Sequence, residues 1–236
     1  MWQGKAADGS FPVVVASPGL NSSRWFFTAW AEELASNGVI VIALDHPYDS
    51  PVTELADGTW VHGKLETTGD DAGDQALADH WAGIRAADMR AVIDQLHSGL
   101  AGLPALRSAD LSQIITAGHS LGGAAALEAA RLDDRVEGAV DIDGMPRTPK
   151  DATPLTKPVM AIVAGDADPL PEYDAALDAL LAKRNGTRVI LDGVTHFGMI
   201  DLGLIVGPVP GITGTRGPTG PTSAAQATLQ LIHAID

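Results

Sequence analysis

Short apolar runs recur along the chain and alternate with alanine- and leucine-rich stretches of helical spacing. Six runs are rich in β-branched residues and most are apolar on both faces, which is the pattern of parallel strands covered by helices. These predicted strands are Phe11–Ser17, Val39–Asp45, Gln113–Gly118, Glu137–Asp143, Pro158–Gly165 and Arg188–Gly193. The predicted helices are Ser23–Ser36, Ala82–Leu96, Gly122–Leu132, Glu172–Lys183 and Ser223–Ile235. This alternation predicts an α/β fold with a doubly wound, mostly parallel sheet.

Two stretches lack this periodicity. Residues 46–80 carry Gly, Asp, Thr and Pro without regular apolar spacing, which predicts a long loop over one rim of the sheet. Residues 207–221 are dense in Gly and Pro and predict an ordered connection without a helix. Such stretches are more often solvated loops than substrate-binding elements. We expect a single domain over residues 1–236, because a chain of this length with 45% hydrophobic residues buries one sizeable core.

The composition narrows the range of partners. Asp and Glu number 30 and Lys and Arg number 15, so the net charge of −15 argues against nucleic acids and anionic membrane surfaces. The absence of cysteine excludes disulfides, thiolate metal sites and a cysteine nucleophile. The apolar runs are too short to span a bilayer, and the first residues, MWQGKAADGS, lack the apolar core of a signal peptide. We expect a soluble protein, either cytoplasmic or secreted with a leader outside this sequence, and the oligomeric state stays open.

The junction of a predicted strand and a predicted helix carries the strongest chemical signal. Residues 114–127 read IITAGHSLGGAAAL, in which residues 118–122 fit the pattern G-x-S-x-G of a nucleophile elbow. The glycines are required because the turn leaves no room for β-carbons on either side of a strained serine. The helix that begins there directs free N–H groups toward developing negative charge. Ser120 is therefore the candidate nucleophile, and an idle serine in a tight turn is the alternative.

A serine nucleophile needs a base, and the chain has seven histidines. Such a base follows the nucleophile in the chain and lies on a loop at the carboxyl edge of the sheet. His196 meets both conditions, because it follows the last predicted strand in the segment DGVTHFGMIDL. His46, by contrast, falls in the loop 46–80, and His233 lies on the last helix. We expect His119, next to Ser120, to support the elbow.

The base needs a carboxylate that fixes its tautomer, and two strand ends supply one. Asp143 ends the strand after the elbow helix, in DIDGMP, and Asp168 follows the next strand, in GDADPLPEYD. These residues alone leave both open. The acidic residues around Asp168 suggest a calcium loop, but Leu170 and Pro171 stand where an EF-hand has a ligand and a glycine. We therefore expect no metal ion.

An oxyanion hole needs two backbone N–H groups. Leu121, the residue after the nucleophile, supplies one, and the loop after an early strand normally supplies the other. That loop is residues 16–23, ASPGLNSS. Pro18 has no N–H group, so Leu20 after Gly19 is the candidate for the second donor.

Three segments carry a resemblance to a known family: residues 17–50, from SPGLNSS to DHPYDS; residues 118–144, from GHSLGG to DIDG; and the segment DGVTHFGMIDL. They resemble the α/β-hydrolases related to plasma-type platelet-activating factor acetylhydrolase, and also bacterial lipase and cutinase-type polyester hydrolases. The resemblance runs from Phe11 to about Leu204. It implies an α/β-hydrolase fold and cofactor-free hydrolysis of carboxylic esters. It also implies Ser120 as nucleophile, His196 as base, and an oxyanion hole of the Leu20 and Leu121 amides. We expect the first one or two strands of that fold to be missing here or reduced to Met1–Trp2.

The two branches of this resemblance differ in the acid. Asp143 matches the acetylhydrolase-like branch, and Asp168 matches the G-x-D-x-D context of the cutinase-like branch. Secreted cutinase-type members often carry a disulfide, which this chain cannot form. We expect Asp143, because its strand directly follows the elbow helix and Gly144 permits a turn that aims the carboxylate inward. Asp168 is the alternative.

The combined pattern predicts a serine carboxylester hydrolase that acts through an acyl-enzyme on a small-molecule or lipid-like ester. The same triad would serve a perhydrolase, or a thioester or amide hydrolase, because the acyl-enzyme is common to all. A non-catalytic α/β-hydrolase that binds a ligand or partner is the alternative from another class. Such a protein has no need of the serine, the histidine, the aspartate and both oxyanion turns together.

Overall fold

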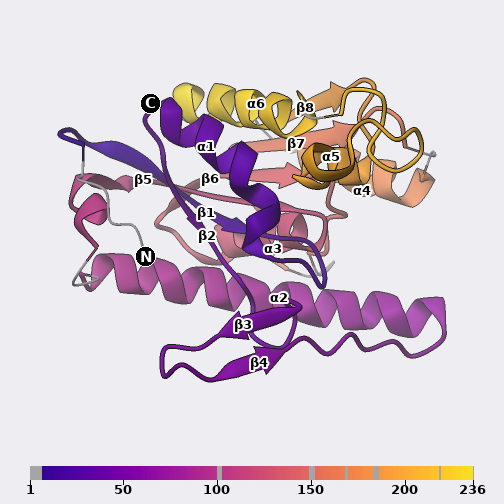
Figure 1. Cartoon of the computed structure of the whole chain (residues 1–236), viewed down its shortest axis with the longest axis horizontal. Helices are drawn as coiled ribbons and strands as arrows, with labels where there is room; N and C mark the ends of the chain where they lie inside the picture. Colours follow the sequence, from indigo (N-terminus) through magenta and orange to yellow (C-terminus); the bar gives the residue numbers. More distant parts are fainter. Residues whose placement is uncertain are drawn as a thin grey trace.

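The computed structural model describes residues 7–99, 103–148, 152–167, 170–182, 186–217 and 219–235. Its centre is a six-stranded sheet in the order β2-β1-β5-β6-β7-β8, in which all neighbouring strands are parallel (Figure 1). The strands are β1 (Phe11–Ser17), β2 (Ile40–Ala43), β5 (Ala109–His119), β6 (Val136–Ile142), β7 (Val159–Ala164) and β8 (Gly186–Leu191). The six predicted strands and the parallel α/β class are confirmed, with boundaries that differ by a few residues.

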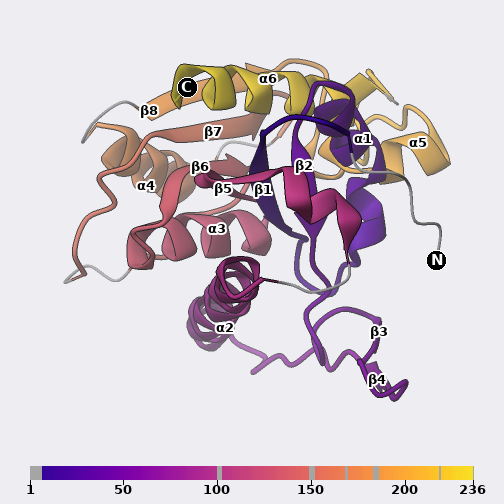
Figure 2. The ribbon, with the colours of Figure 1, turned by 90° about the vertical axis from the view of Figure 1, so that its left-hand side faces the viewer.

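Helices cover both faces of this sheet (Figure 2). The helices are α1 (Thr28–Ser36), α2 (Asp71–His97), α3 (Leu121–Leu132), α4 (Pro171–Leu181), α5 (Leu202–Val206) and α6 (Thr219–Ile235). Short 3₁₀ turns lie at η1 (Arg24–Phe27), η2 (Pro104–Ser108) and η3 (His196–Met199). One face packs against α1 and α6, and the other packs against α2, α3 and α4. Along β7, Met160 and Ile162 pack on the side of the sheet that α1 and α6 cover. Val159 and Val163 pack on the side that α2, α3 and α4 cover, so the strand is apolar on both faces.

The prediction of a loop over residues 46–80 is wrong in two places. An antiparallel hairpin of β3 (Val52–Glu54) and β4 (Trp60–His62) lies within it, and α2 already begins at Asp71. Each hairpin strand has three residues, of which only the central one is buried, so no alternating pattern is long enough to be recognised. The first turns of α2 are largely exposed and lack an apolar stripe. Their start is fixed by the Asp70 carboxylate, which accepts the Gly73 N–H at 2.9 Å.

The C-terminal connection follows the prediction over most of its length. Residues 207–217 contain turns and no helix, whereas residues 219–221, which were predicted as part of the connection, form the first turn of α6. Pro221 is tolerated there, because the first N–H groups of a helix have no intrahelical acceptor. The prediction for Met1–Trp2 falls outside the described residues. Among the helices that the structure describes, none has the length and apolar character needed to cross a membrane.

Candidate active site

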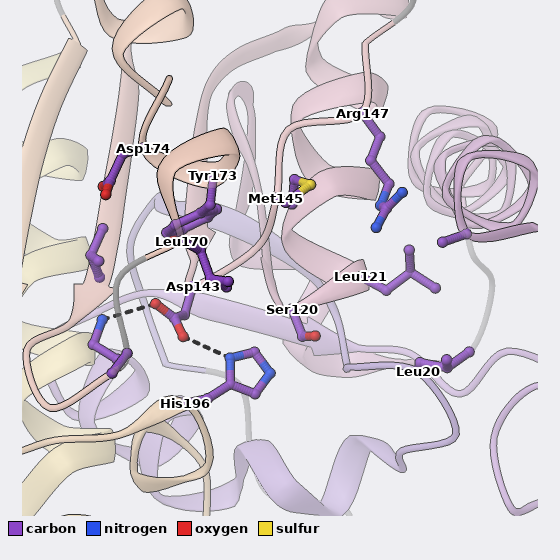
Figure 3. Close-up of a pocket in the computed structure, with 14 residues that line it drawn as sticks. Leu20, Ser120, Leu121, Asp143, Met145, Arg147, Leu170, Tyr173, Asp174 and His196 are labelled. Carbon is purple, nitrogen blue, oxygen red and sulfur yellow. Dashed lines mark hydrogen bonds and ion pairs between the residues drawn. The ribbon is translucent and has the colours of Figure 1, made fainter. Parts of the chain in front are cut away.

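The loops after β1, β5, β6 and β8 meet around one cavity of about 450 Å³ at the carboxyl edge of the sheet (Figure 3). Its lining includes Leu20, Ser120, Leu121, Asp143 and His196. The structure therefore brings together every described residue that the sequence assigned to chemistry. Asp168, the alternative acid, lies outside the described residues. Sites at the carboxyl ends of parallel strands are the rule in open α/β sheets.

Ser120 occupies a strained turn between β5 and α3. Its φ of 56° and ψ of −124° lie in a region that residues with a side chain rarely adopt. A β-carbon on Gly118 would lie 2.2 Å from the Gly122 carbonyl oxygen, and one on Gly122 would lie 2.0 Å from the Ser17 carbonyl oxygen. The Ser120 N–H donates to the Ile142 carbonyl at 2.9 Å, which ties the turn to the end of β6. Glycine on both sides is therefore a steric requirement of this turn.

His196 begins the short turn η3 and is oriented by Asp143. Its Nδ1 lies 2.6 Å from Asp143 Oδ2, while Asp143 Oδ1 accepts the Ala164 N–H at 2.9 Å. The side chain of Asp143 is 9% exposed and that of His196 is 34% exposed. Burial raises the pKa of Asp143, but the hydrogen bonds from His196 and the Ala164 amide outweigh it, so this pKa lies below its usual value. The carboxylate thus stays ionised and holds the proton of the imidazole on Nδ1.

Asp143 is itself held in an uncommon backbone conformation. Its φ is 56°, and its N–H donates to the Ile162 carbonyl at 2.8 Å. A β-carbon on the next residue, Gly144, would lie 2.3 Å from the Ser120 carbonyl oxygen. Only glycine therefore fits after Asp143, and the turn brings the carboxylate beside His196.

His119 lies buried against His196. Its Nε2–H donates to the His196 carbonyl at 2.9 Å, and the two rings are 4.4 Å apart between centroids. Burial, together with the charge of His196, lowers the pKa of His119 to about 3, so this ring is neutral near pH 7. His119 therefore supports the backbone at His196, whereas the sequence analysis expected it to support the elbow at Ser120.

The carbonyl groups next to Leu20 and Leu121 show which way their amides face. The Ser120 carbonyl accepts the N–H groups of Gly123 and Ala124 at 2.9 and 3.2 Å, along the axis of α3. The Gly19 carbonyl accepts Ser22 N–H at 3.2 Å. In a trans peptide the N–H points opposite to the preceding C=O. The N–H groups of Leu20 and Leu121 therefore point in the direction opposite to the carbonyl groups of Gly19 and Ser120, and both leucines border the cavity.

Sequence reasoning missed several residues of this region. Met145, Leu170 and Tyr173 line the cavity, and they gave no periodic signal because they lie on loops or on the exposed start of α4. The Tyr173 hydroxyl is buried without a hydrogen-bond partner in the described structure, and burial raises its pKa above the usual value. His46 lies in a loop, as predicted, but no sequence pattern indicated that it is buried, with 2% of its surface exposed. Among the described residues, no three His, Asp or Glu side chains gather closely enough to hold a metal ion.

Comparisons with known proteins agree with this architecture. Residues 3–59 match the family model described as platelet-activating factor acetylhydrolase, isoform II. The chain is 29% identical over 133 residues to a probable 1-alkyl-2-acetylglycerophosphocholine esterase of Arthroderma benhamiae, covering 56% of this chain and 31% of that protein. It is 27% identical over 161 residues to the platelet-activating factor acetylhydrolase of Cavia porcellus, covering 56% of this chain and 35% of that protein. The chain therefore spans about a third of these curated relatives.

Two solved structures share the fold. A ferulic acid esterase from Streptomyces cinnamoneus has a TM-score of 0.74 and 31% identity, covering 97% of this chain and 66% of that one. A dienelactone hydrolase from Anabaena variabilis has a TM-score of 0.59 and 18% identity, covering 97% of this chain and 88% of that one. The sheet order, the flanking helices and these similarities identify the class: the chain belongs to the α/β-hydrolase superfamily.

Proposed function

We propose that this protein is a serine carboxylester hydrolase with Ser120 as nucleophile, His196 as base and Asp143 as the acid of the triad. The observation that carries the proposal is the hydrogen bond of 2.6 Å between His196 Nδ1 and Asp143 Oδ2, in the same cavity as the strained Ser120. A proton held on Nδ1 leaves Nε2 as the nitrogen that can accept the serine proton. The names of the similar proteins, esterase and acetylhydrolase, support the same reaction class.

The proposed reaction runs through an acyl-enzyme. Ser120 Oγ attacks the ester carbonyl carbon while His196 Nε2 takes the hydroxyl proton. The amides of Leu20 and Leu121 donate to the negative oxygen of the tetrahedral intermediate. His196 then gives its proton to the departing alkoxide, and an alcohol leaves. A water molecule then attacks the carbonyl carbon of the acyl-enzyme while His196 takes its proton. The bond to Ser120 Oγ breaks, His196 returns the proton to that oxygen, and the carboxylic acid leaves.

The lining of the cavity supports an ester with an apolar acyl or aryl part. Met145, Val163, Leu170 and the ring of Tyr173 border the cavity beside the proposed triad. A cavity of about 450 Å³ lies within the range that small-molecule sites occupy. We therefore propose a small or lipid-like ester as substrate, in agreement with the substrates named for the similar esterases.

Substitution of the nucleophile tests the proposal. Ser120→Ala should abolish hydrolysis of p-nitrophenyl butyrate and covalent labelling by a fluorophosphonate, because both need the serine oxygen. Ser98→Ala, which removes an exposed hydroxyl at the end of α2, is the matched control and should retain both. A Ser120→Ala protein that keeps the parental rate, or a parent that takes no label, would exclude a serine mechanism. A series of p-nitrophenyl esters from acetate to palmitate would then measure the acyl length that the cavity accepts.

A further inference from the structure

A buried arginine lies behind the proposed oxyanion hole. Arg85, on α2, is 1% exposed, and burial lowers the pKa of its guanidinium although it remains charged. A charged group inside a protein is costly unless it is paired and hydrogen-bonded. Arg85 therefore needs strong partners, and their identity indicates what it does.

The partners of Arg85 belong to the loop that carries Leu20. Nη1 donates to the Pro18 carbonyl and lies 3.3 Å from Ser17 Oγ, and Nη2 donates to the Gly19 carbonyl at 3.0 Å. The guanidinium also pairs with Asp49, through Nε at 2.7 Å and Nη2 at 2.6 Å from Oδ2. One side chain from α2 thus holds two successive carbonyl groups of this loop.

Asp49 extends this contact to the other side of Leu20. Its second oxygen, Oδ1, accepts the N–H of Asn21 at 2.9 Å, and Asn21 has a left-handed φ of 49°. The Arg85–Asp49 pair therefore fixes the Gly19 C=O and the Asn21 N–H, the peptide groups on either side of Leu20. With the Gly19 carbonyl held toward Arg85, the trans peptide directs the Leu20 N–H the opposite way.

The back of Arg85 is supported in turn. The Ser17 hydroxyl contacts His46 Nε2 at 2.9 Å, and His46 Nδ1 lies 2.7 Å from Asp88 Oδ2. Ser17 is 0% exposed and His46 is 2% exposed, so a substrate cannot reach this Ser-His-Asp chain. The Ser17–His46–Asp88 chain therefore has a structural role, because it orients the Ser17 oxygen that accepts a hydrogen bond from Arg85.

We propose that Arg85 and Asp49 are positioning residues that aim the Leu20 amide at the oxyanion of the transition state. This inference rests on the proposed ester hydrolysis. The pair touches no substrate, and it acts by fixing the loop of residues 17–23. Preorganised donors of this kind stabilise the transition state far more than the bound substrate.

Two substitutions separate positioning from folding. Arg85→Lys keeps the charge, but a single ammonium cannot hold Pro18, Gly19 and Asp49 in the fork geometry of a guanidinium. Asp49→Asn is the milder variant, since its one carbonyl oxygen can replace only one of the two carboxylate oxygens. The matched control is Arg131→Lys on α3, which alters a similarly buried pair with Glu128, 10% and 14% exposed, away from residues 17–23.

Three measurements follow on the parent and each variant. In p-nitrophenyl butyrate hydrolysis, Arg85→Lys and Asp49→Asn should lower kcat by about 10²-fold with KM little changed, as expected for a displaced oxyanion donor. The affinity for phenylboronic acid, whose tetrahedral adduct places an oxygen in the hole, should fall by a similar factor. Hydrogen exchange in the peptide spanning residues 17–23 should become faster. Arg131→Lys should change none of these.

The outcomes distinguish the inference from the proposed function. A parental exchange rate of residues 17–23 in both variants would overturn the positioning role, and so would a loss of kcat that Arg131→Lys shares. A parent without ester hydrolysis would refute the proposed function, and the exchange measurement would still decide whether the pair holds the loop. If Arg85→Lys does not fold, the same three measurements on Asp49→Asn decide.

Discussion

Replacement of Asp143 by asparagine gives a prediction that follows directly from the hydrogen bonds around it. The Ala164 N–H donates to Asp143 Oδ1 at 2.9 Å, so an asparagine should place its carbonyl oxygen there and its NH₂ toward His196. The NH₂ needs an acceptor, which forces His196 Nδ1 to lose its proton and Nε2 to carry it. The imidazole then faces Ser120 with a donor instead of an acceptor. Asparagine also tolerates the left-handed φ of 56°, so the backbone should persist.

The expected loss is large, because the wrong tautomer cannot act as a base. The analogous change in chymotrypsin-like proteases lowers kcat by about four orders of magnitude. At about 1.4 kcal/mol per tenfold change, that corresponds to about 5.5 kcal/mol of transition-state stabilisation. The contact of 2.6 Å between His196 and a carboxylate that is 9% exposed places this protein in the same regime, since little water competes for the imidazole.

The assay compares Asp143→Asn with Asp168→Asn. Both variants are checked for parental circular dichroism, and kcat is then measured on p-nitrophenyl butyrate. Asp143→Asn should lose about 10⁴-fold in kcat and Asp168→Asn should lose far less. A deep loss for Asp168→Asn with a near-normal Asp143→Asn would refute the argument and assign the acid as in the cutinase-like branch.

Two further predictions concern the base and a buried acid. His196→Ala should remove most of the hydrolysis of p-nitrophenyl butyrate, because no other group among the described residues is placed to accept the serine proton. His233→Ala, which alters an exposed histidine on α6, should keep the parental rate, and equal loss in the two variants would contradict the assignment. Burial raises the pKa of Asp141 well above its usual value of 3.8. As the pH rises above 3.8, Asp141 loses its proton in the unfolded chain before it does so in the folded protein, so the folded protein loses stability. Asp141→Asn lacks this titration, so its free energy of unfolding by urea should gain on that of the parent between pH 4 and pH 8, and a pH-independent difference would exclude the buried acid as the cause.

The sequence was sufficient for the parts of the molecule that local physics determines. The central strands are apolar on both faces, and β1 was predicted with its observed limits, Phe11–Ser17. The nucleophile elbow could be predicted because glycine is sterically required on both sides of Ser120. His196 was placed by chain order and by its position after the last strand.

The rest depends on contacts between residues far apart in the chain. Arg85 stands on the apolar stripe of α2 with Ala82, Ala86 and Met89, and an arginine at such a position was a signal that sequence reasoning did not use. Its carbonyl acceptors lie more than sixty residues earlier, at Pro18 and Gly19, so the spacing along the chain gives no indication of them. The choice between Asp143 and Asp168 has the same character, because in the sequence both aspartates follow predicted strands.

The residues that follow β5 and β6 share the same backbone conformation and the same hydrogen bond to the next strand, which explains why the proposed nucleophile and acid lie side by side. Ser120 and Asp143 each have a φ of 56°, and each N–H still donates to the next strand, to the carbonyls of Ile142 and Ile162. The sheet therefore holds both residues in a conformation that costs about 1–3 kcal/mol each. His119 pairs with Ile142 in the parallel register. Ser120 and Asp143, the residues that follow them, therefore occupy equivalent positions on neighbouring strands, which are about 4.8 Å apart. A slip of one residue between β5 and β6 would turn the carboxylate to the opposite face of the sheet, so the register of two central strands determines whether His196 can reach both groups.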